Sequence, residues 1–224
     1  MYLFILGNMK KYLFSVIILI VLSQFATAQE DYRIGIKVGP SYSLSRTSSD
    51  GNSTDIGRDG TAVKFLIGPF IDLPFKENYH LHTGITFASK ATRISITDPA
   101  VLAGQKISER YDHEYLQLPV LLKLYTNEVI LDTKVFFNFG IVPEILLNTN
   151  NETPGNNFVS EFRALDLSGN FGGGLERSIG VNTRVYAGIN YYIGFLDQVK
   201  TQNPIYDDFK VKSNLFSLEF GIKF

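Results

Sequence analysis

Residues 214–224 alternate between apolar side chains and polar or small ones. Every second position is apolar, and the positions between are polar or glycine: the apolar set is Phe216, Leu218, Phe220, Ile222 and Phe224, and the other set is Ser217, Glu219, Gly221 and Lys223. A strand with this pattern has one apolar face and one polar face. On an edge strand of a soluble protein such a face invites aggregation. On a closed barrel in lipid, the outer surface requires it.

The first 28 residues have the layout of a secretory signal peptide. Lys10 and Lys11 precede an apolar run over residues 12–22, and Ala26 and Ala28 supply a small-residue cleavage site. The run is too short to span a bilayer comfortably as a helix, which disfavours an uncleaved anchor. We expect cleavage after Ala28 and one mature domain over residues 29–224, with the start at Met1 or Met9 left open.

The composition excludes several classes of protein. The chain has 21 Lys and Arg, 22 Asp and Glu, 3 His and no Cys, for a formal net charge of -1. This balance gives no electrostatic case for nucleic acid. Without Cys there are no disulfides and no lipoprotein anchor, and a zinc site is disfavoured.

Eight segments repeat the alternation of the last one, over residues 32–44, 63–73, 79–87, 115–125, 134–147, 165–176, 181–195 and 214–224. Most are long enough to cross a membrane as tilted strands. The connections near 45–60, 92–113, 148–163 and 196–213 are long and polar, and those near 74–78, 126–133 and 177–180 are short. This asymmetry is typical of outer-membrane barrels. The sequence therefore predicts an all-β, eight-stranded antiparallel up-and-down transmembrane β-barrel with both termini in the periplasm. The alternative is a soluble lipocalin-like binding barrel with its faces inverted.

In a membrane barrel the polar face lines the lumen, which eight strands leave just wide enough for side chains to fill. Charges buried there should pair across strands, because an isolated buried charge is costly. We expect a plugged lumen with a structural network of Arg33, Lys37, Lys64, Asp72, Lys90, Lys123, Glu144, Asp166, Glu176, Arg184, Glu219 and Lys223. Inward glycines such as Gly35 and Gly221 would make room for the long side chains. Pro69, Pro119 and Pro143 should each mark a bulge or a local break.

Several segments carry a family resemblance. Tyr115-Leu-Gln-Leu-Pro-Val-Leu-Leu-Lys123, Phe137-Asn-Phe-Gly-Ile-Val-Pro143 and Gly169-Asn-Phe-Gly-Gly-Gly-Leu-Glu176 resemble the PorT-like family of small outer-membrane β-barrels of Bacteroidetes-type bacteria. The resemblance implies an integral outer-membrane barrel without assigned chemistry, and one branch of the family serves the type IX secretion and gliding machinery. It also implies that Phe220, Ile222 and Phe224 act as an insertion signal read by the barrel-insertion machinery.

Candidate chemistry is sparse. His80 and His82 share a strand face, but His113 belongs to the opposite end of the barrel, so we expect no metal site and no cofactor. A lipid-A-modifying enzyme would need a nucleophile and a base at the outer rim. The rim offers Ser45, Ser48, Ser49 and His113, whose spacing does not indicate such a pair. The expected function is structural, adhesive or envelope-assembling, without catalysis. Expected partners are outer-membrane lipid and lipopolysaccharide and the insertion machinery. The alternatives are an accessory of a type IX secretion complex and the lipid-A-modifying enzyme.

Overall fold

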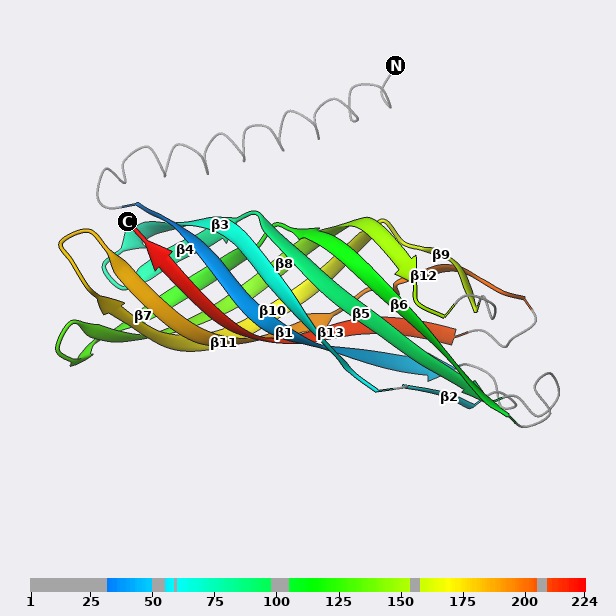
Figure 1. The fold of residues 1–224 in the computed structure, drawn as a ribbon. Helices are drawn as coiled ribbons and strands as arrows, with labels where there is room; N and C mark the ends of the chain where they lie inside the picture. Colours follow the sequence, from blue (N-terminus) through cyan, green and yellow to red (C-terminus); the bar gives the residue numbers. More distant parts are fainter. Residues whose placement is uncertain (1–31, 50–54, 59, 98–104, 154–157, 205–208) are drawn as a thin grey trace, which may run out of the picture.

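The chain forms long antiparallel strands wound into a closed barrel (Figure 1). The computed structural model describes residues 32–49, 55–58, 60–97, 105–153, 158–204 and 209–224. The proposed cleavage residues Ala26 and Ala28 lie outside this described part. Across the described ranges, no helix is long and apolar enough to span a membrane.

The described residues hold thirteen strands, some of which are pieces of one longer strand. Their bounds are β1 (Arg33–Ser49), β2 (Asp55–Arg58), β3 (Ala62–Lys76), β4 (Tyr79–Gly84), β5 (Thr86–Thr97), β6 (Lys106–Gln117), β7 (Val120–Ile130), β8 (Thr133–Asn151), β9 (Val159–Phe162), β10 (Leu165–Ser178), β11 (Arg184–Gly194), β12 (Val199–Gln202) and β13 (Phe209–Lys223).

Eight long strands make the barrel wall once two interrupted ones are joined. Thr83 of β4 faces Val120 of β7, and Thr86 of β5 faces Gln117 of β6, so the two pairs share one register. β4–β5 and β6–β7 are therefore each one strand with a break. The wall closes where β13 pairs with β1, with Ile36 opposite Ile222. The predicted eight-stranded antiparallel barrel, including closure of the last strand on the first, is confirmed.

Two of the three strand prolines interrupt the neighbouring strand and not their own. At Pro119 the expected break is confirmed, because β6 ends at Gln117 and β7 begins at Val120. β3 and β8 run unbroken through Pro69 and Pro143, so a bulge or break in those strands was a wrong expectation. The partner strands are interrupted instead, where Ile85 N donates to Pro69 O at 3.1 Å and Leu118 N to Pro143 O at 2.9 Å. A proline carbonyl still accepts, but the missing N–H leaves the facing residue with one ladder bond fewer.

The outward face of the wall is apolar. Ile36, Phe139 and Phe220 are 50%, 46% and 46% exposed, while the alternate residues are mostly buried. The soluble lipocalin-like alternative is wrong, because it needs the apolar face inside. Towards one end the belt gives way to polar residues, from Leu44 to Arg46 on β1. We call this end, which holds the residues next to the long connections, the loop end, and the other the turn end (Figure 1).

Strand pairing continues past the belt at the loop end. β5 and β6 pair as far as Thr97 and Lys106, so much of the stretch near 92–113 is strand and not the expected long polar connection. Short strands also form inside the other long connections, where β9 pairs with β12. The alternation there was hidden because Ile94, Ile96 and Tyr111 point inward, opposite to the apolar positions of the belt.

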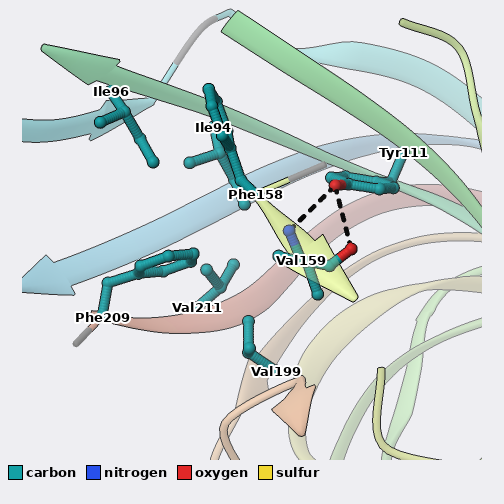
Figure 2. Packing of buried hydrophobic residues seen from close by; sticks show 8 residues of the cluster. All are labelled: Ile94, Ile96, Tyr111, Phe158, Val159, Val199, Phe209 and Val211. Carbon is teal, nitrogen blue, oxygen red and sulfur yellow. Dashed lines mark hydrogen bonds between the residues drawn. The ribbon is translucent and has the colours of Figure 1, made fainter. Parts of the chain in front are cut away.

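Those inward residues build an apolar cluster at the loop end (Figure 2). It joins the inner faces of β5, β6 and β13 to the β9–β12 pair, through Ile94, Ile96, Tyr111, Phe158, Val159, Val199, Phe209 and Val211. The Tyr111 hydroxyl also accepts a hydrogen bond from Val159 N at 3.3 Å. We call this cluster the apolar cap.

Candidate functional site: the filled lumen

The polar face of each strand lines the lumen, and its side chains form three tiers between the turn end and the apolar cap. This placement follows from the two-residue period of a strand, which sends alternate side chains inward. Lys37, Asp72 and Glu219 are 2%, 0% and 3% exposed, although each carries a charge.

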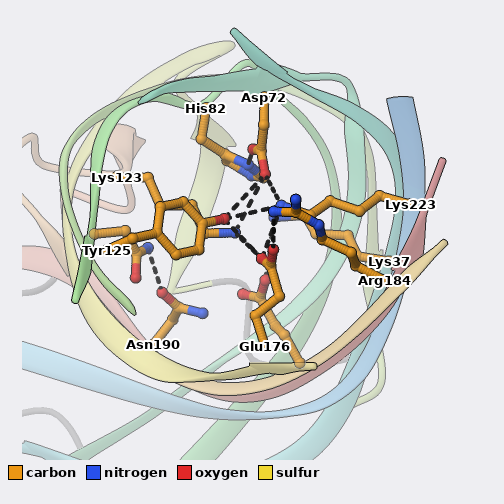
Figure 3. Close-up of polar contacts among 11 residues, drawn as sticks. Lys37, Asp72, His82, Lys123, Tyr125, Glu176, Arg184, Asn190 and Lys223 are labelled. Carbon is orange, nitrogen blue, oxygen red and sulfur yellow. Dashed lines mark hydrogen bonds and ion pairs between the residues drawn. The ribbon is translucent and has the colours of Figure 1, made fainter. Parts of the chain in front are cut away.

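The turn-end tier centres on Asp72 of β3 and Glu176 of β10 (Figure 3). Lys223 Nζ lies 2.7 Å from both Asp72 Oδ2 and Glu176 Oε2. Lys123 Nζ of β7 lies 3.4 Å from the same Asp72 oxygen and 3.7 Å from Glu176 Oε2. Two lysines from different strands thus bridge two carboxylates, the arrangement in which buried charges compensate one another.

Three further side chains complete this tier. His82 Nδ1 is 2.6 Å from Asp72 Oδ1. The Tyr125 hydroxyl donates to Glu176 Oε2 at 2.7 Å and accepts from Lys223 Nζ at 2.9 Å. Arg184 Nη1 lies 3.4 Å from the other oxygen of Glu176. Each carboxylate oxygen in the tier therefore has a donor or a cation beside it.

Aromatic rings surround the ammonium of Lys123. Its Nζ lies 4.3 Å from the ring centre of Phe136, 4.8 Å from that of Tyr186 and 5.3 Å from that of Tyr125. Ring faces attract a cation, and the attraction is stronger away from water. Glycines on neighbouring strands leave room for two aromatic rings at this end of the lumen. A Cβ on Gly221 would meet the Tyr186 ring, and a Cβ on Gly35 would meet the ring of Phe70.

The middle tier pairs Lys37 of β1 with Glu219 of β13, Nζ to Oε2, at 3.2 Å. The hydroxyls of Tyr192 and Ser217 donate to the other Glu219 oxygen at 2.8 and 2.9 Å. Beside them, Asn138 Nδ2 donates to the side-chain oxygens of Asn170 and Asn190 at 2.9 and 2.7 Å. Fixed amide and hydroxyl groups take the place of solvent at this level.

The loop-end tier joins Lys90 of β5 to Glu144 of β8, which also accepts from Gln117 Nε2 at 3.2 Å. Gln198, in the segment between β11 and β12, is only 2% exposed. Its Nε2 donates to the Tyr115 hydroxyl at 2.9 Å and to Asp166 Oδ2 at 3.3 Å, and its Oε1 accepts from Thr92 at 3.1 Å. A residue from outside the wall thus binds three wall strands from within.

Charges balance across the three tiers. The tiers hold five cationic side chains and five carboxylates: Lys37, Lys90, Lys123, Arg184 and Lys223, and Asp72, Glu144, Asp166, Glu176 and Glu219. Four of the carboxylates form ion pairs, and Asp166 accepts from the neutral amide of Gln198. The other two residues expected in the network lie at its edges. Arg33 is buried at the turn end, where it donates to Asn182 O at 3.2 Å, and the partly buried Lys64 pairs with Asp112 of β6.

The expected network contained only charged side chains, whereas the structure adds neutral ones from the same strand faces. Tyr125 and Tyr192 have the inward strand phase, and this phase was the only available signal for them. His82 also has that phase, but its pairing with Asp72 depends on the register between β3 and β4. Gln198 lies in a connection without periodicity, so no sequence signal marks it.

The residues considered for other chemistry do not converge. His82 belongs to the turn-end tier, whereas His113 lies beyond the belt, where its Nδ1 is 2.9 Å from Thr149 Oγ1. Among the described residues, no group of three or more His, Asp or Glu is placed to hold a metal ion. At the rim, the Ser45 hydroxyl accepts from Arg93 N at 3.1 Å, and Ser48 is exposed.

The fold and the lumen define the class: an integral outer-membrane β-barrel with a side-chain-filled interior. The chain matches the family described as "Outer membrane protein beta-barrel domain" over residues 23–194, and it belongs to that family. No curated protein matches it in sequence.

Solved outer-membrane barrels share the fold. The outer-membrane protein OprG of Pseudomonas aeruginosa superposes with a TM-score of 0.55 at 12% identity, and Neisserial surface protein A does so with 0.50 at 10% identity. Each alignment covers 86% of this chain and 95% of the other. At these identities the likeness shows the fold alone.

Proposed function

We propose that this protein is a closed, non-catalytic outer-membrane barrel with a structural, adhesive or envelope-assembly role. In this proposal the turn end and both termini face the periplasm, and the loop end faces outward. The lumen network is structural and takes no cofactor. Lipid, lipopolysaccharide and the insertion machinery are its general partners.

The observation that carries the proposal is the filled lumen. Three tiers of paired side chains and an apolar cap occupy it from one end to the other. A conducting pore needs a continuous water path, and a lumen filled by packed and largely paired side chains leaves little room for one. Asn138 Oδ1 and Asn170 Nδ2 in the middle tier are buried without a hydrogen-bond partner among the described residues.

Single-channel recording in planar bilayers tests this. We expect no stable conductance steps from the folded protein, with a general porin as the positive control. Porin-like conductance, or swelling of liposomes in sugar solutions at porin rates, would contradict a closed lumen.

The proposed orientation has its own test. A protease-sensitive tag placed in residues 98–104 should be cut on intact cells, whereas one placed at Asp132 should be protected. The reverse pattern would contradict the proposed orientation.

One observation favours a second role, as an accessory of an envelope complex such as the type IX machinery of the PorT-like proteins. Large apolar side chains stand exposed at the turn end, with Ile130, Leu131 and Val181 at 72%, 77% and 98%. Photo-crosslinkers at Leu131 and Val181 should capture a discrete envelope protein in cells if this role holds. Capture of lipid alone would reject it.

The rim gives no support to a lipid-A-modifying enzyme, because Ser45 and His113 are buried and engaged with other partners. Unchanged lipid A on deletion of the gene is the expected result.

Phe220, Ile222 and Phe224 are proposed as the insertion signal, supported by their outward apolar face on the closing strand. Polar substitution of Phe224 should lower recovery in the outer membrane, and full recovery would reject that role.

A further inference from the structure

An apolar groove of about 750 Å³ runs across the outer face of the wall, bordered mostly by outward residues and also by Lys37 and Tyr186, whose side chains point into the lumen. Its lining includes Leu175, Val185, Ala187 and Phe220, and it extends to Ile67 on β3. Leu175 faces Ala187, and Ala187 faces Phe220, so the small alanine side chain lies between two large ones. The groove therefore follows the hydrogen-bonding direction, from β10 through β11, β13 and β1 to β3.

The groove rises from the turn end towards the middle of the belt. Arg177 is one residue from the end of β10, whereas Ile67 is nine residues from the end of β3 at Lys76. Four strand spacings of about 4.8 Å give a length of roughly 19 Å. Because barrel strands are tilted, that length runs obliquely to the membrane normal, and the groove covers part of the roughly 15 Å depth of one leaflet's hydrocarbon layer, half of a bilayer core.

Its one charged outward side chain lies at the shallow end. Arg177 is exposed, faces Thr133 and Val185 on the neighbouring strands, and forms no ion pair with any other residue in the described ranges. A guanidinium matches a phosphate through two parallel N–H···O bonds. The groove thus combines a phosphate-binding group at headgroup level with an apolar channel leading into the bilayer.

We propose that this groove binds one glycerophospholipid, with its phosphate on Arg177 and one acyl chain along Ala187 and Phe220 towards Ile67. The choice of a phospholipid over lipopolysaccharide rests on the proposed periplasmic position of the turn end. The binding itself does not depend on the lumen being closed.

Native mass spectrometry of the folded barrel, purified from outer membranes and held in a non-ionic detergent, tests the site. The wild-type protein should retain one phospholipid. Arg177→Gln removes the phosphate contact, and Ala187→Phe fills the groove. Arg177→Gln should lower retention at least about tenfold, the effect expected from losing a charge-assisted hydrogen bond. Ala187→Phe should lower retention as well, because its ring occupies the place of the acyl chain.

Matched controls separate this site from general lipid adhesion. Lys76→Gln removes another exposed cation at the turn end, and Ile189→Phe enlarges the next outward residue of β11; neither residue lines the groove. Both should retain lipid as the wild type does. Heat-modifiable gel migration verifies that every variant is folded. Equal retention by all five proteins, or retention of lipopolysaccharide or free fatty acid instead, would overturn the proposal.

A second readout uses the absence of Trp from the chain. Leu175→Trp places a fluorophore on the groove, and Tyr79→Trp places one on β4 outside it. With a small fraction of acyl-brominated phosphatidylglycerol in phosphatidylcholine bilayers, the Leu175→Trp protein should be quenched more than the Tyr79→Trp protein. Arg177→Gln should remove that difference. Equal quenching at both positions would contradict a lipid site.

Discussion

The turn-end tier and the apolar cap close opposite ends of the same lumen by different physical means. In the turn-end tier, side chains of the wall strands meet in directed ion pairs and hydrogen bonds around Asp72 and Glu176. In the cap, the β9–β12 pair from two connections packs on Ile94 and Val211 through apolar contacts. The tier is therefore part of the wall itself, whereas the cap is a separate layer, supplied largely by the connections, that covers the lumen.

A buried ion network is sensitive to the loss of a single partner. Removing one member leaves the others as uncompensated buried charges, which is far costlier than the net gain from the intact pair. Apolar packing lacks this all-or-none character, because each contact is small and non-directional. The two ends should therefore fail differently when one residue is changed.

The largest effect is expected from Asp72→Asn, which leaves Lys123, Lys223 and His82 facing a neutral amide. We expect a loss of about 3–5 kcal/mol in the free energy of unfolding. Urea unfolding of the barrel in lipid vesicles measures it. Glu161→Gln is the control, because Glu161 pairs with Lys200 at 2.7 Å with both side chains 54% exposed. It should cost less than about 1 kcal/mol. Equal midpoints for the two variants would remove the proposed distinction between buried and exposed pairs.

An intermediate and local effect is expected from Phe158→Ala in the cap. Its side chain is fully buried, and its carbonyl accepts from Asn203 N at 3.0 Å. Loss of a buried Phe costs about 3–5 kcal/mol where it is felt, so amide exchange at Val159 and Asn203 should quicken by about a hundredfold or more. The wall should stay folded and the lumen closed, because the three tiers remain.

Hydrogen exchange with mass spectrometry and bilayer recording together check this. Phe75→Ala, at an exposed position of β3, is the control for removing a Phe. New conductance in Phe158→Ala would show that the cap, and not the tiers, seals the lumen.

The smallest effect is expected in the pH dependence of the free energy of unfolding, through His113. This residue lies beyond the apolar belt, between the loop-end tier and the cap. Its ring contacts Phe162 at 4.5 Å between ring centres. Burial, with a smaller effect of Lys90, lowers its pKa from 6.5 to about 3. Between these values the unfolded chain binds a proton that the folded protein does not. The free energy of unfolding should therefore fall as the pH falls below 6.5, by up to about 1.4 kcal/mol per pH unit.

Comparing the wild type with His113→Gln in urea unfolding between pH 7 and pH 5 isolates this contribution, since carboxylates titrate mainly below that range. The His113→Gln protein should show the flatter dependence on pH. If the unfolding free energies of the two proteins changed with pH in parallel, His113 would be hydrated in the folded protein. The boundary between the loop-end tier and the cap would then lie further towards the loop end.

The sequence by itself determined the wall. Alternation over segments such as 32–44 and 214–224 predicted the strand count and which side chains share a face, because a strand has a two-residue period. Strand length and the asymmetry of the connections favoured the apolar face outward, and the exposure of residues such as Ile36 and Phe220 decided it. The break at Ile85, opposite Pro69, was not predicted, because the missing N–H of a proline affects the neighbouring strand, whose identity and register a single segment does not carry.

Only the tertiary structure decided the partners. Lys223 and Asp72 are 151 residues apart in sequence and meet because β13 and β3 flank β1 in the closed sheet. Gln198 reaches the lumen from a connection without periodicity, and the proposed phospholipid groove exists because residues of six strands lie side by side on the closed wall. Periodicity is a local property of a strand, so the sequence specifies which side chains share a face. Register and closure are global, so the fold specifies what it meets.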